Sequence, residues 1–398
     1  MVYLSRFFME GKKCEAKKLF VVKSNIFDHS SFMLSMRIYA FLFLFGCITS
    51  TQAQILGGEH VFEFLRLSQN PHVTALGGVA ISCPANDVMM STSNPALLRP
   101  SFHTSLGLNY NRYYAGTKVS NLFYAQHIKS LNTTVGLGIQ YLNYGSFQLT
   151  DNIGNQYGDA KAADYAISLS ASKSYLTRWR YGATLKLANS TLIDKKASAL
   201  LADIGVAYAD TMNLWYAGAV IKNAGVVIKN YEAGVNQPLP IDLQIGVTKK
   251  FKKAPFSIMV LAHHLQTWNI RYDNPADQVN NQLLFTDSNN TKTKTYFADK
   301  LFRHFVFALD INLGKRLEIS AGYNHMRRAE LAISEKKAMS GFSYGMGLYL
   351  NKFIIHVAQS HYHIAGASTE IGLAFKLNQL IGGGNHINWS EKFANSYQ

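Results

Sequence analysis

Beyond Pro100 the chain alternates between large apolar residues and small or polar ones with a period of two. Residues 241–248 read Ile-Asp-Leu-Gln-Ile-Gly-Val-Thr, and residues 317–324 read Leu-Glu-Ile-Ser-Ala-Gly-Tyr-Asn. Residues 370–376 read Glu-Ile-Gly-Leu-Ala-Phe-Lys. Successive side chains of a β-strand point to opposite faces, so this pattern predicts strands with one large apolar face and one small or polar face.

The length of these segments decides between two all-β architectures. Each runs to about ten residues, the length that a tilted strand needs to cross a bilayer, whereas strands of soluble proteins usually have about 5–6. In a membrane barrel the apolar face meets lipid and the small polar face lines the lumen. We therefore predict an all-β, 14-stranded antiparallel transmembrane β-barrel, an even count as in bacterial single-chain barrels, with twelve or sixteen strands as alternatives. The predicted strands are 103–111, 118–128, 133–143, 162–172, 179–188, 199–209, 213–222, 240–250, 254–264, 302–312, 316–325, 341–350, 353–361 and 368–376.

Aromatic residues and connection lengths support a membrane barrel. Tyr and Trp collect near the segment ends, as an interfacial girdle would, at Tyr141, Tyr144, Trp179, Tyr181, Trp215, Tyr216, Tyr323 and Tyr349. Short turns at 313–315 and 351–352 fit the periplasmic side. Longer links fit the outer side, at 144–161, 189–198, 223–239 and 265–301. The last link is polar and unusually long, so it is either a surface loop without a specific role or a partner-binding element.

Residues 54–100 lack the alternation and precede the first predicted strand. The pairs Gly57-Gly58 and Gly77-Gly78 allow close turns. The turn Asn94-Pro95-Ala96 is typical of an Asn cap with Pro at the first helical position. The segment is too apolar to lie free in the periplasm, so we predict a hatch folded into the lumen, with a periplasmic extension packed on the barrel as the alternative. The Asn94 turn is then either an ordinary helix cap or a hatch element whose docking matters.

The first 53 residues predict an export signal behind an upstream extension. From Met36 one Arg precedes an apolar run at 38–48, and Thr51-Gln52-Ala53 forms a small-x-small cleavage site. This run is shorter than the roughly 20 residues of a spanning helix. Lipidation at Cys47 is the alternative interpretation. We expect an upstream start artefact at 1–35, a signal peptide at 36–53, the hatch at 54–100, the barrel at 101–378 and a tail at 379–398.

Charge and cysteine content narrow the class further. Without residues 1–53 the chain keeps 32 basic and 21 acidic side chains, and Cys83 is its one cysteine. An exported protein of this size without disulfides needs another source of stability, which a closed barrel supplies. The basic residues are scattered through turns and loops, which favours an anionic lipopolysaccharide neighbourhood over nucleic acid.

No motif in the sequence predicts catalysis, a cofactor or a metal site. Ser170-Ala171-Ser172-Lys173 matches the S-x-x-K signature, but on a strand residues three apart point to opposite faces, so Ser170 and Lys173 cannot act together. His263 and His264 have no carboxylate or cysteine spaced along the chain to complete a metal site, and neither have His356, His361 and His363. We expect loop or interfacial histidines and no enzyme.

The sequence of residues 57–98 resembles the amino-terminal region of the PorQ family, which belongs with the PorV and FadL-like barrels. The residues that carry the resemblance are Gly57, Gly58, Phe62, Phe64, Leu65, Leu67, Thr74, Ala75, Leu76, Gly77, Gly78, Asn94, Pro95, Ala96, Leu97 and Leu98. One departure is His72-Val73-Thr74, where the family has a basic residue before Ala75.

The resemblance implies a non-enzymatic outer-membrane component of the type IX secretion system of Bacteroidota. Its implied partners are a PorZ-like surface protein, a PorU-like sortase and a PorV-like barrel, in a complex that attaches cargo to anionic lipopolysaccharide. A FadL-like transporter of a long-chain fatty acid or another hydrophobic small molecule is the alternative, with Phe62, Phe64 and Leu65 lining a pocket. A soluble exported β-sandwich with a binding role is a third hypothesis.

Overall fold

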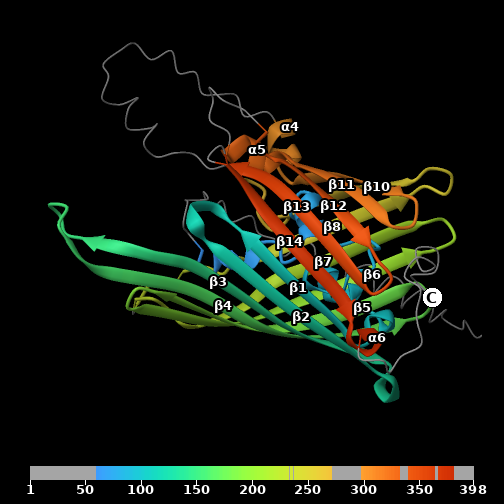
Figure 1. Cartoon of the computed structure of the whole chain (residues 1–398), viewed down its shortest axis with the longest axis horizontal. Helices are drawn as coiled ribbons and strands as arrows, with labels where there is room; N and C mark the ends of the chain where they lie inside the picture. The colour runs from blue at the N-terminus through green and yellow to red at the C-terminus, as the bar shows by residue number, and fades with distance from the viewer. Residues whose placement is uncertain are drawn as a thin grey trace, which may run out of the picture. The chain divides into compact units, whose positions relative to one another are not determined.

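The computed structural model describes residues 60–232, 234–235, 237–270, 297–331, 339–363 and 366–380, and over these it confirms the predicted 14-stranded closed antiparallel barrel (Figure 1). The strands are β1 (Ser105–Arg112), β2 (Lys118–Ile128), β3 (Thr133–Thr150), β4 (Gln156–Tyr175), β5 (Trp179–Leu192), β6 (Lys195–Asp210), β7 (Trp215–Lys229), β8 (Asp242–Lys250), β9 (Phe256–Ala262), β10 (Phe305–Leu313), β11 (Leu317–Asn324), β12 (Phe342–Tyr349), β13 (Phe353–His363) and β14 (Gly366–Lys376). Each of the fourteen overlaps one predicted segment.

The barrel closes where its first and last strands pair. β1 pairs with β14 from Ser105↔Lys376 to Arg112↔Thr369, and its other edge pairs with β2. Within the closed part of the barrel each described strand pairs on both sides, which is the condition for a sheet to cross lipid.

The two faces of the barrel follow the sequence alternation. On β5 and β6 most of the large apolar residues point outward, with Leu185 57% and Ile204 62% exposed, while the neighbouring Thr184 and Asp203 are buried. Outward apolar residues of this kind form the lipid-facing surface of a membrane barrel.

The aromatic girdle is only partly as predicted. Trp179, Tyr181 and Trp215 are exposed near the ends of β5 and β7. Tyr216 and Tyr349 are instead buried, so their inclusion in the girdle was wrong. Each lies on the inward phase of its strand, which the rule of aromatic residues near strand ends does not consider.

The two ends of the barrel differ in their connections, as predicted. At one end, here the short-turn end, every connection between strands has five residues or fewer. The other end, the long-link end, carries the connections 230–241, 263–304 and 325–341. Short periplasmic turns and longer outer loops are the rule for outer-membrane barrels.

Two of the predicted outer links are largely strand, and a third is partly strand. β3 and β4 remain paired beyond Asn143 and Ala162, where their pairing with β2 and β5 stops, so 144–161 is a projecting hairpin (Figure 1). Links 189–198 and 223–239 are shortened in the same way because β5, β6 and β7 continue into them. Residues 144–159 of the hairpin are exposed or half-buried on both faces, so the sequence there lacks the alternation that marks strands in lipid. Most of the predicted link 265–301 lies outside the described residues.

Short helices make up most of the remaining described elements. Five precede β1: η1 (Glu63–Arg66), α2 (Pro71–Ala75), η2 (Val88–Thr92), η3 (Pro95–Leu97) and η4 (Pro100–Phe102). The others are η5 (Tyr114–Gly116), η6 (Lys129–Leu131), α4 (Phe297–Phe302), α5 (His325–Leu331) and α6 (Leu377–Leu380). None of the helices in the described residues is long and apolar enough to cross a membrane.

Candidate functional site

Residues 60–104, here called the inner segment, run along the inward face of the barrel. The Val61 amide donates to the Pro238 carbonyl at the long-link end, 3.1 Å away, and the Leu377 amide donates to the Thr104 carbonyl at the short-turn end, 2.8 Å away. Between these contacts the segment is mostly buried, with Leu76 and Ile81 fully so. The domain boundaries, and the role of this segment as a hatch, stay predictions.

The turn at Asn94 docks the inner segment on one side of the wall. Asn94 Oδ1 accepts from the Ala96 amide at 3.0 Å, which is the predicted Asn cap of η3 with Pro95 at the first position. Its Nδ2 also donates to the Ile81 carbonyl at 3.2 Å and to the Val206 carbonyl of β6 at 3.3 Å. One side chain therefore caps the turn and joins it to the wall.

Inward-facing glycines make the space that this turn occupies. A Cβ added at Gly182 of β5 would lie 2.6 Å from the carbonyl carbon of Pro95. A Cβ at Gly205 of β6, the register partner of Gly182, would meet the Asn94 side chain. The small residues of the inward face are thus a docking surface, because any side chain there would push the inner segment away from the sheet.

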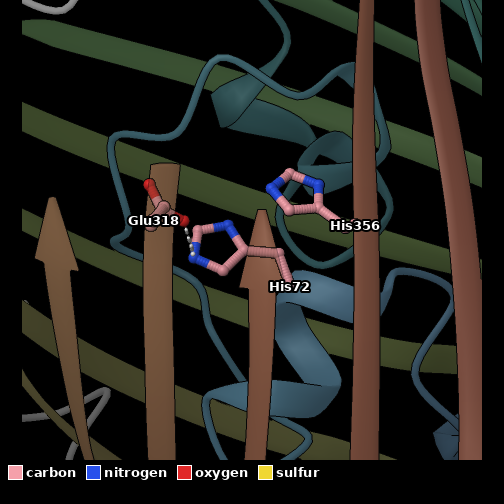
Figure 2. A group of neighbouring side chains, drawn as sticks. All are labelled: His72, Glu318 and His356. Atoms are coloured by element: carbon pink, nitrogen blue, oxygen red, sulfur yellow. Dashed lines mark ion pairs between the residues drawn. The ribbon is translucent and has the colours of Figure 1, made fainter. Parts of the chain in front are cut away.

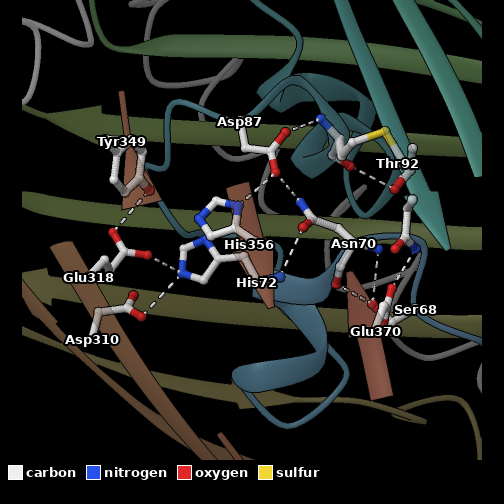
Figure 3. Close-up of polar contacts among 12 residues, drawn as sticks. Ser68, Asn70, His72, Asp87, Thr92, Asp310, Glu318, Tyr349, His356 and Glu370 are labelled. Carbon is white, nitrogen blue, oxygen red and sulfur yellow. Dashed lines mark hydrogen bonds and ion pairs between the residues drawn. The ribbon is translucent and has the colours of Figure 1, made fainter. Parts of the chain in front are cut away.

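On the opposite side His72 of α2 reaches two carboxylates on neighbouring strands. Its Nε2 lies 2.8 Å from Glu318 Oε1 of β11 (Figure 2) and 3.1 Å from Asp310 Oδ1 of β10 (Figure 3). All three side chains are buried. Burial alone would lower the pKa of His72, but the Glu318 and Asp310 carboxylates outweigh it and raise that pKa well above its usual value. His72 is therefore a charged link between the inner segment and the wall.

A second layer of polar groups surrounds this link (Figure 3). The His356 ring of β13 stacks on His72, with centroids 5.1 Å apart, and its Nδ1 lies 3.4 Å from Asp87 Oδ2. Asn70 Nδ2 donates to the same carboxylate oxygen at 3.0 Å. Nearby, Thr74 donates to Glu370 of β14. Four carboxylates thus hold the two ends of α2 against β10, β11, β13 and β14.

A cavity of about 200 Å³ lies between the inner segment and the wall at the long-link end. Its lining combines apolar and charged side chains: Leu65, Leu67, Val73, Val79 and Met326 with Arg66, Lys222, Arg327, Glu63 and Asp242. His263 and His264 also line it, and the His264 amide donates to Asp242 Oδ1 at 2.7 Å. Burial lowers the pKa of His264 to about 3 and that of His263 well below its usual value, so both rings are neutral.

The structure distributes the predicted hatch residues over several roles. Phe62 and Phe64 pack in a buried apolar cluster with residues of the wall, whereas Leu65 also lines the cavity. Gly77 and Gly78 have φ angles of 95° and 84°, the left-handed region that glycine tolerates. Asn94, Pro95 and Ala96 form the docked turn. Gly57 and Gly58 lie outside the described residues.

Sequence reasoning about the histidines missed their partners. Asp242 lies beside His263 and His264, and Glu318 forms one cluster with His72 and His356. Neither carboxylate is near these histidines along the chain. The sequence did hold one signal for these partners. Asp310, Glu318 and Glu370 are charged residues at the inward-facing positions of alternating strands. The prediction that Ser170 and Lys173 point to opposite faces of the strand is confirmed. Ser170 is buried and shares a hydrogen bond of 2.8 Å with Thr184 Oγ1, whereas Lys173 is exposed.

No family model and no curated protein matches this sequence. Among solved structures it is similar to the Pseudomonas putida toluene transporter TodX, at 13% identity over 81% of this chain and 98% of that one, with a TM-score of 0.45. It is also similar to the CymD monoaromatic hydrocarbon channel, at 10% identity over 80% and 99%, with a TM-score of 0.48. The KdgM porin is similar at 4% identity over 68% and 98%, with a TM-score of 0.31. These likenesses concern the fold.

The location of the protein follows from its own barrel. A closed antiparallel sheet satisfies its backbone groups internally, and its outward face is apolar along the strands. The protein is integral to the bacterial outer membrane.

Proposed function

We propose that this protein is a non-enzymatic, FadL-like channel that takes an amphiphilic small molecule with an acidic head group into the long-link cavity. The observation that carries the proposal is the composition of that cavity. Apolar side chains at Leu65, Val79 and Met326 lie in one lining with the cations Arg66, Lys222 and Arg327. An apolar surface with a few placed charges is typical of ligand sites.

The size of the cavity restricts the ligand. Its volume of about 200 Å³ is below the roughly 300–1,000 Å³ of ordinary small-molecule sites. The site therefore holds a small ligand, or the head group and first carbons of a longer one. The inner segment is mostly buried between this cavity and the short-turn end, so passage further into the barrel would require it to move.

A cavity-filling substitution tests the proposal. Val79→Trp adds bulk to the cavity lining, and the matched control Val226→Trp places the same ring on the outward face of β7, where Val226 is 62% exposed. We expect binding of a radiolabelled fatty acid to the purified barrel to fall in Val79→Trp and to persist in the control. Equal binding by both folded variants would exclude this cavity as the ligand site.

A second candidate is a scaffold in a type IX secretion attachment complex, as the sequence resemblance implies. The observation that favours it is the projecting β3–β4 hairpin, on which Phe147, Ile153 and Tyr157 are exposed beyond the paired neighbours. Exposed aromatic and aliphatic side chains of this kind suit a protein partner.

Affinity capture from native outer membranes tests the scaffold. It predicts that PorZ-like, PorU-like or PorV-like proteins copurify with the barrel, and that deletion of 146–159 reduces their recovery. Recovery of a fatty acid without any of the three proteins would favour the channel instead.

A further inference from the structure

A second, smaller cavity lies between the inner segment and the wall, next to His72. Its volume is about 30 Å³, enough for one water molecule or a small ion. His72 and Cys83 of the inner segment line it together with Asp310 and Glu318 of the wall. Lys250, at the short-turn end of β8, also lines it. Imidazole, thiol and carboxylate are the side chains that bind transition metals.

The potential ligand atoms of three of these residues are close enough to share one ion. His72, Cys83 and Asp310 offer atoms that all lie within 4.8 Å of one another. Cys83 Sγ is 3.8 Å from Asp310 Oδ2, and His72 Nε2 is 3.1 Å from Asp310 Oδ1. Zinc–ligand bonds of about 2.0–2.3 Å in a tetrahedron place neighbouring ligand atoms about 3.3–3.8 Å apart.

Hydrogen bonding alone leaves this cluster incompletely satisfied. His72 Nε2 faces both Asp310 Oδ1 and Glu318 Oε1, but a single N–H donates along one direction. Glu318 Oε1 is buried, and its 2.8 Å contact with His72 Nε2 is an ion pair that lacks the alignment of a hydrogen bond. A cation in place of the proton interacts with both carboxylates at once.

Neighbouring hydroxyl groups orient the two carboxylates. Ser320 Oγ donates to Asp310 Oδ1 at 2.6 Å, and Tyr349 Oη donates to Glu318 Oε2 at 3.1 Å. Such outer hydrogen bonds are typical of metal sites because they fix the ligand rotamers.

A competing group, His72 with Glu318 and His356, has less suitable geometry. The two imidazole rings are stacked with an angle of 19° between their planes. A nitrogen lone pair lies in the plane of its ring, so nearly parallel rings cannot direct both lone pairs to one ion. The set that contains Cys83 does not have this conflict.

We propose that His72, Cys83 and Asp310 bind a divalent transition metal ion, with Zn²⁺ the best match to one nitrogen, one sulfur and one oxygen ligand. The fourth position is left to a water molecule beside Glu318. Binding releases the thiol proton of Cys83 and the Nε2 proton of His72 to solvent. The ion would join the inner segment to β10, and this inference does not depend on which function is proposed above.

Metal titration of the full-length folded barrel tests the site. The reduced protein in detergent is stripped with a chelator, dialysed against Zn²⁺ and measured for metal content, and parallel Co²⁺ samples are examined for a thiolate-to-metal absorption band. We expect one Zn²⁺ per chain and a Co²⁺–thiolate band. Because losing even an outer hydrogen bond costs about 10–100-fold in affinity, Cys83→Ser and Asp310→Asn should each weaken Zn²⁺ binding at least about 10-fold.

The control variant is His356→Gln, which removes a neighbouring imidazole but no proposed ligand. It should keep stoichiometric Zn²⁺ and the Co²⁺–thiolate band, and the heat-dependent mobility of each variant in electrophoresis reports that the barrel is folded. The proposal is overturned if the folded parent chain binds no stoichiometric metal, or if Cys83→Ser binds Zn²⁺ as tightly as the parent. Loss of binding in His356→Gln alone would also overturn it, by assigning the metal to the stacked pair.

Discussion

Gly182 of β5 lies against Pro95 of the inner segment, with the Pro95 carbonyl carbon 2.6 Å from where a Cβ on Gly182 would be. Neither group can yield easily, because one belongs to the barrel sheet and the other to a capped turn. The close approach of the two backbones therefore depends on the absence of a side chain.

A valine at position 182 should separate the turn from the wall. Overpacking of this kind costs about 1–3 kcal/mol, and we expect Gly182→Val to unfold at lower denaturant concentration and to expose 94–97 to protease. Gly158→Val is the matched control, since a Cβ there meets nothing within 4 Å. A Gly182→Val protein as stable and protease-resistant as the control would contradict the docking described here.

Removing the amide of Asn94 should loosen the same turn without adding bulk. Asn94→Ala loses the cap to Ala96 and the bonds to Ile81 and Val206, and a lost cap costs about 0.5–2 kcal/mol. Hydrogen exchange should become faster at the amides of residues 96–98 and stay unchanged in the strands. The control is Asn155→Ala in the exposed β3–β4 turn, which should leave exchange at residues 96–98 unchanged. If Asn94→Ala also leaves exchange at 96–98 unchanged, the prediction is refuted.

Lys186 and Asp203 form a buried ion pair on the inward face, with Nζ 2.6 Å from Oδ2. Removing one partner leaves an uncompensated buried charge, so Lys186→Met should cost about 3–5 kcal/mol of unfolding free energy. Adding Asp203→Asn should restore part of the loss. Lys195→Met breaks the exposed pair with Glu232 and should leave the unfolding free energy nearly unchanged, because solvent screens that pair.

Denaturant titration in detergent or lipid measures all of these variants. Equal costs for Lys186→Met and Lys195→Met would show that the interior of the barrel is as well hydrated as its surface.

The position of the membrane can be tested from the outward face. Leu185 is 57% exposed in the middle of β5, so Leu185→Arg should cost about 2–4 kcal/mol in a bilayer, as arginine does near the midplane. Tyr157 is 68% exposed on the projecting hairpin, and Tyr157→Arg should cost no more than about 1 kcal/mol. Refolding into lipid vesicles across a denaturant series measures both, and the reverse order would place the bilayer over the hairpin.

Much of the barrel could be predicted because the alternation along each strand also decides which side chains face lipid and which face the inside of the barrel. At 241–248 the alternation of Ile and Leu with Asp, Gln and Gly predicts which side chains face lipid, and the structure has them there. The prediction stopped short at 144–161, where both faces of the hairpin lie in water and the sequence has no reason to alternate.

The amino-acid sequence by itself determined the alternating strands, the two faces of the wall and the Asn94 cap, since each depends on residues adjacent along the chain. It favoured fourteen strands, and the closed barrel decided that number against twelve or sixteen. Only the tertiary structure decided which groups meet inside the barrel. His72, Cys83, Asp310 and Glu318 lie up to 246 positions apart and share one buried cluster because β10 and β11 pair beside α2. The spacing of these residues along the chain does not predict that they are in contact. Their contact follows from barrel closure and from the glycines that let the inner segment approach the wall.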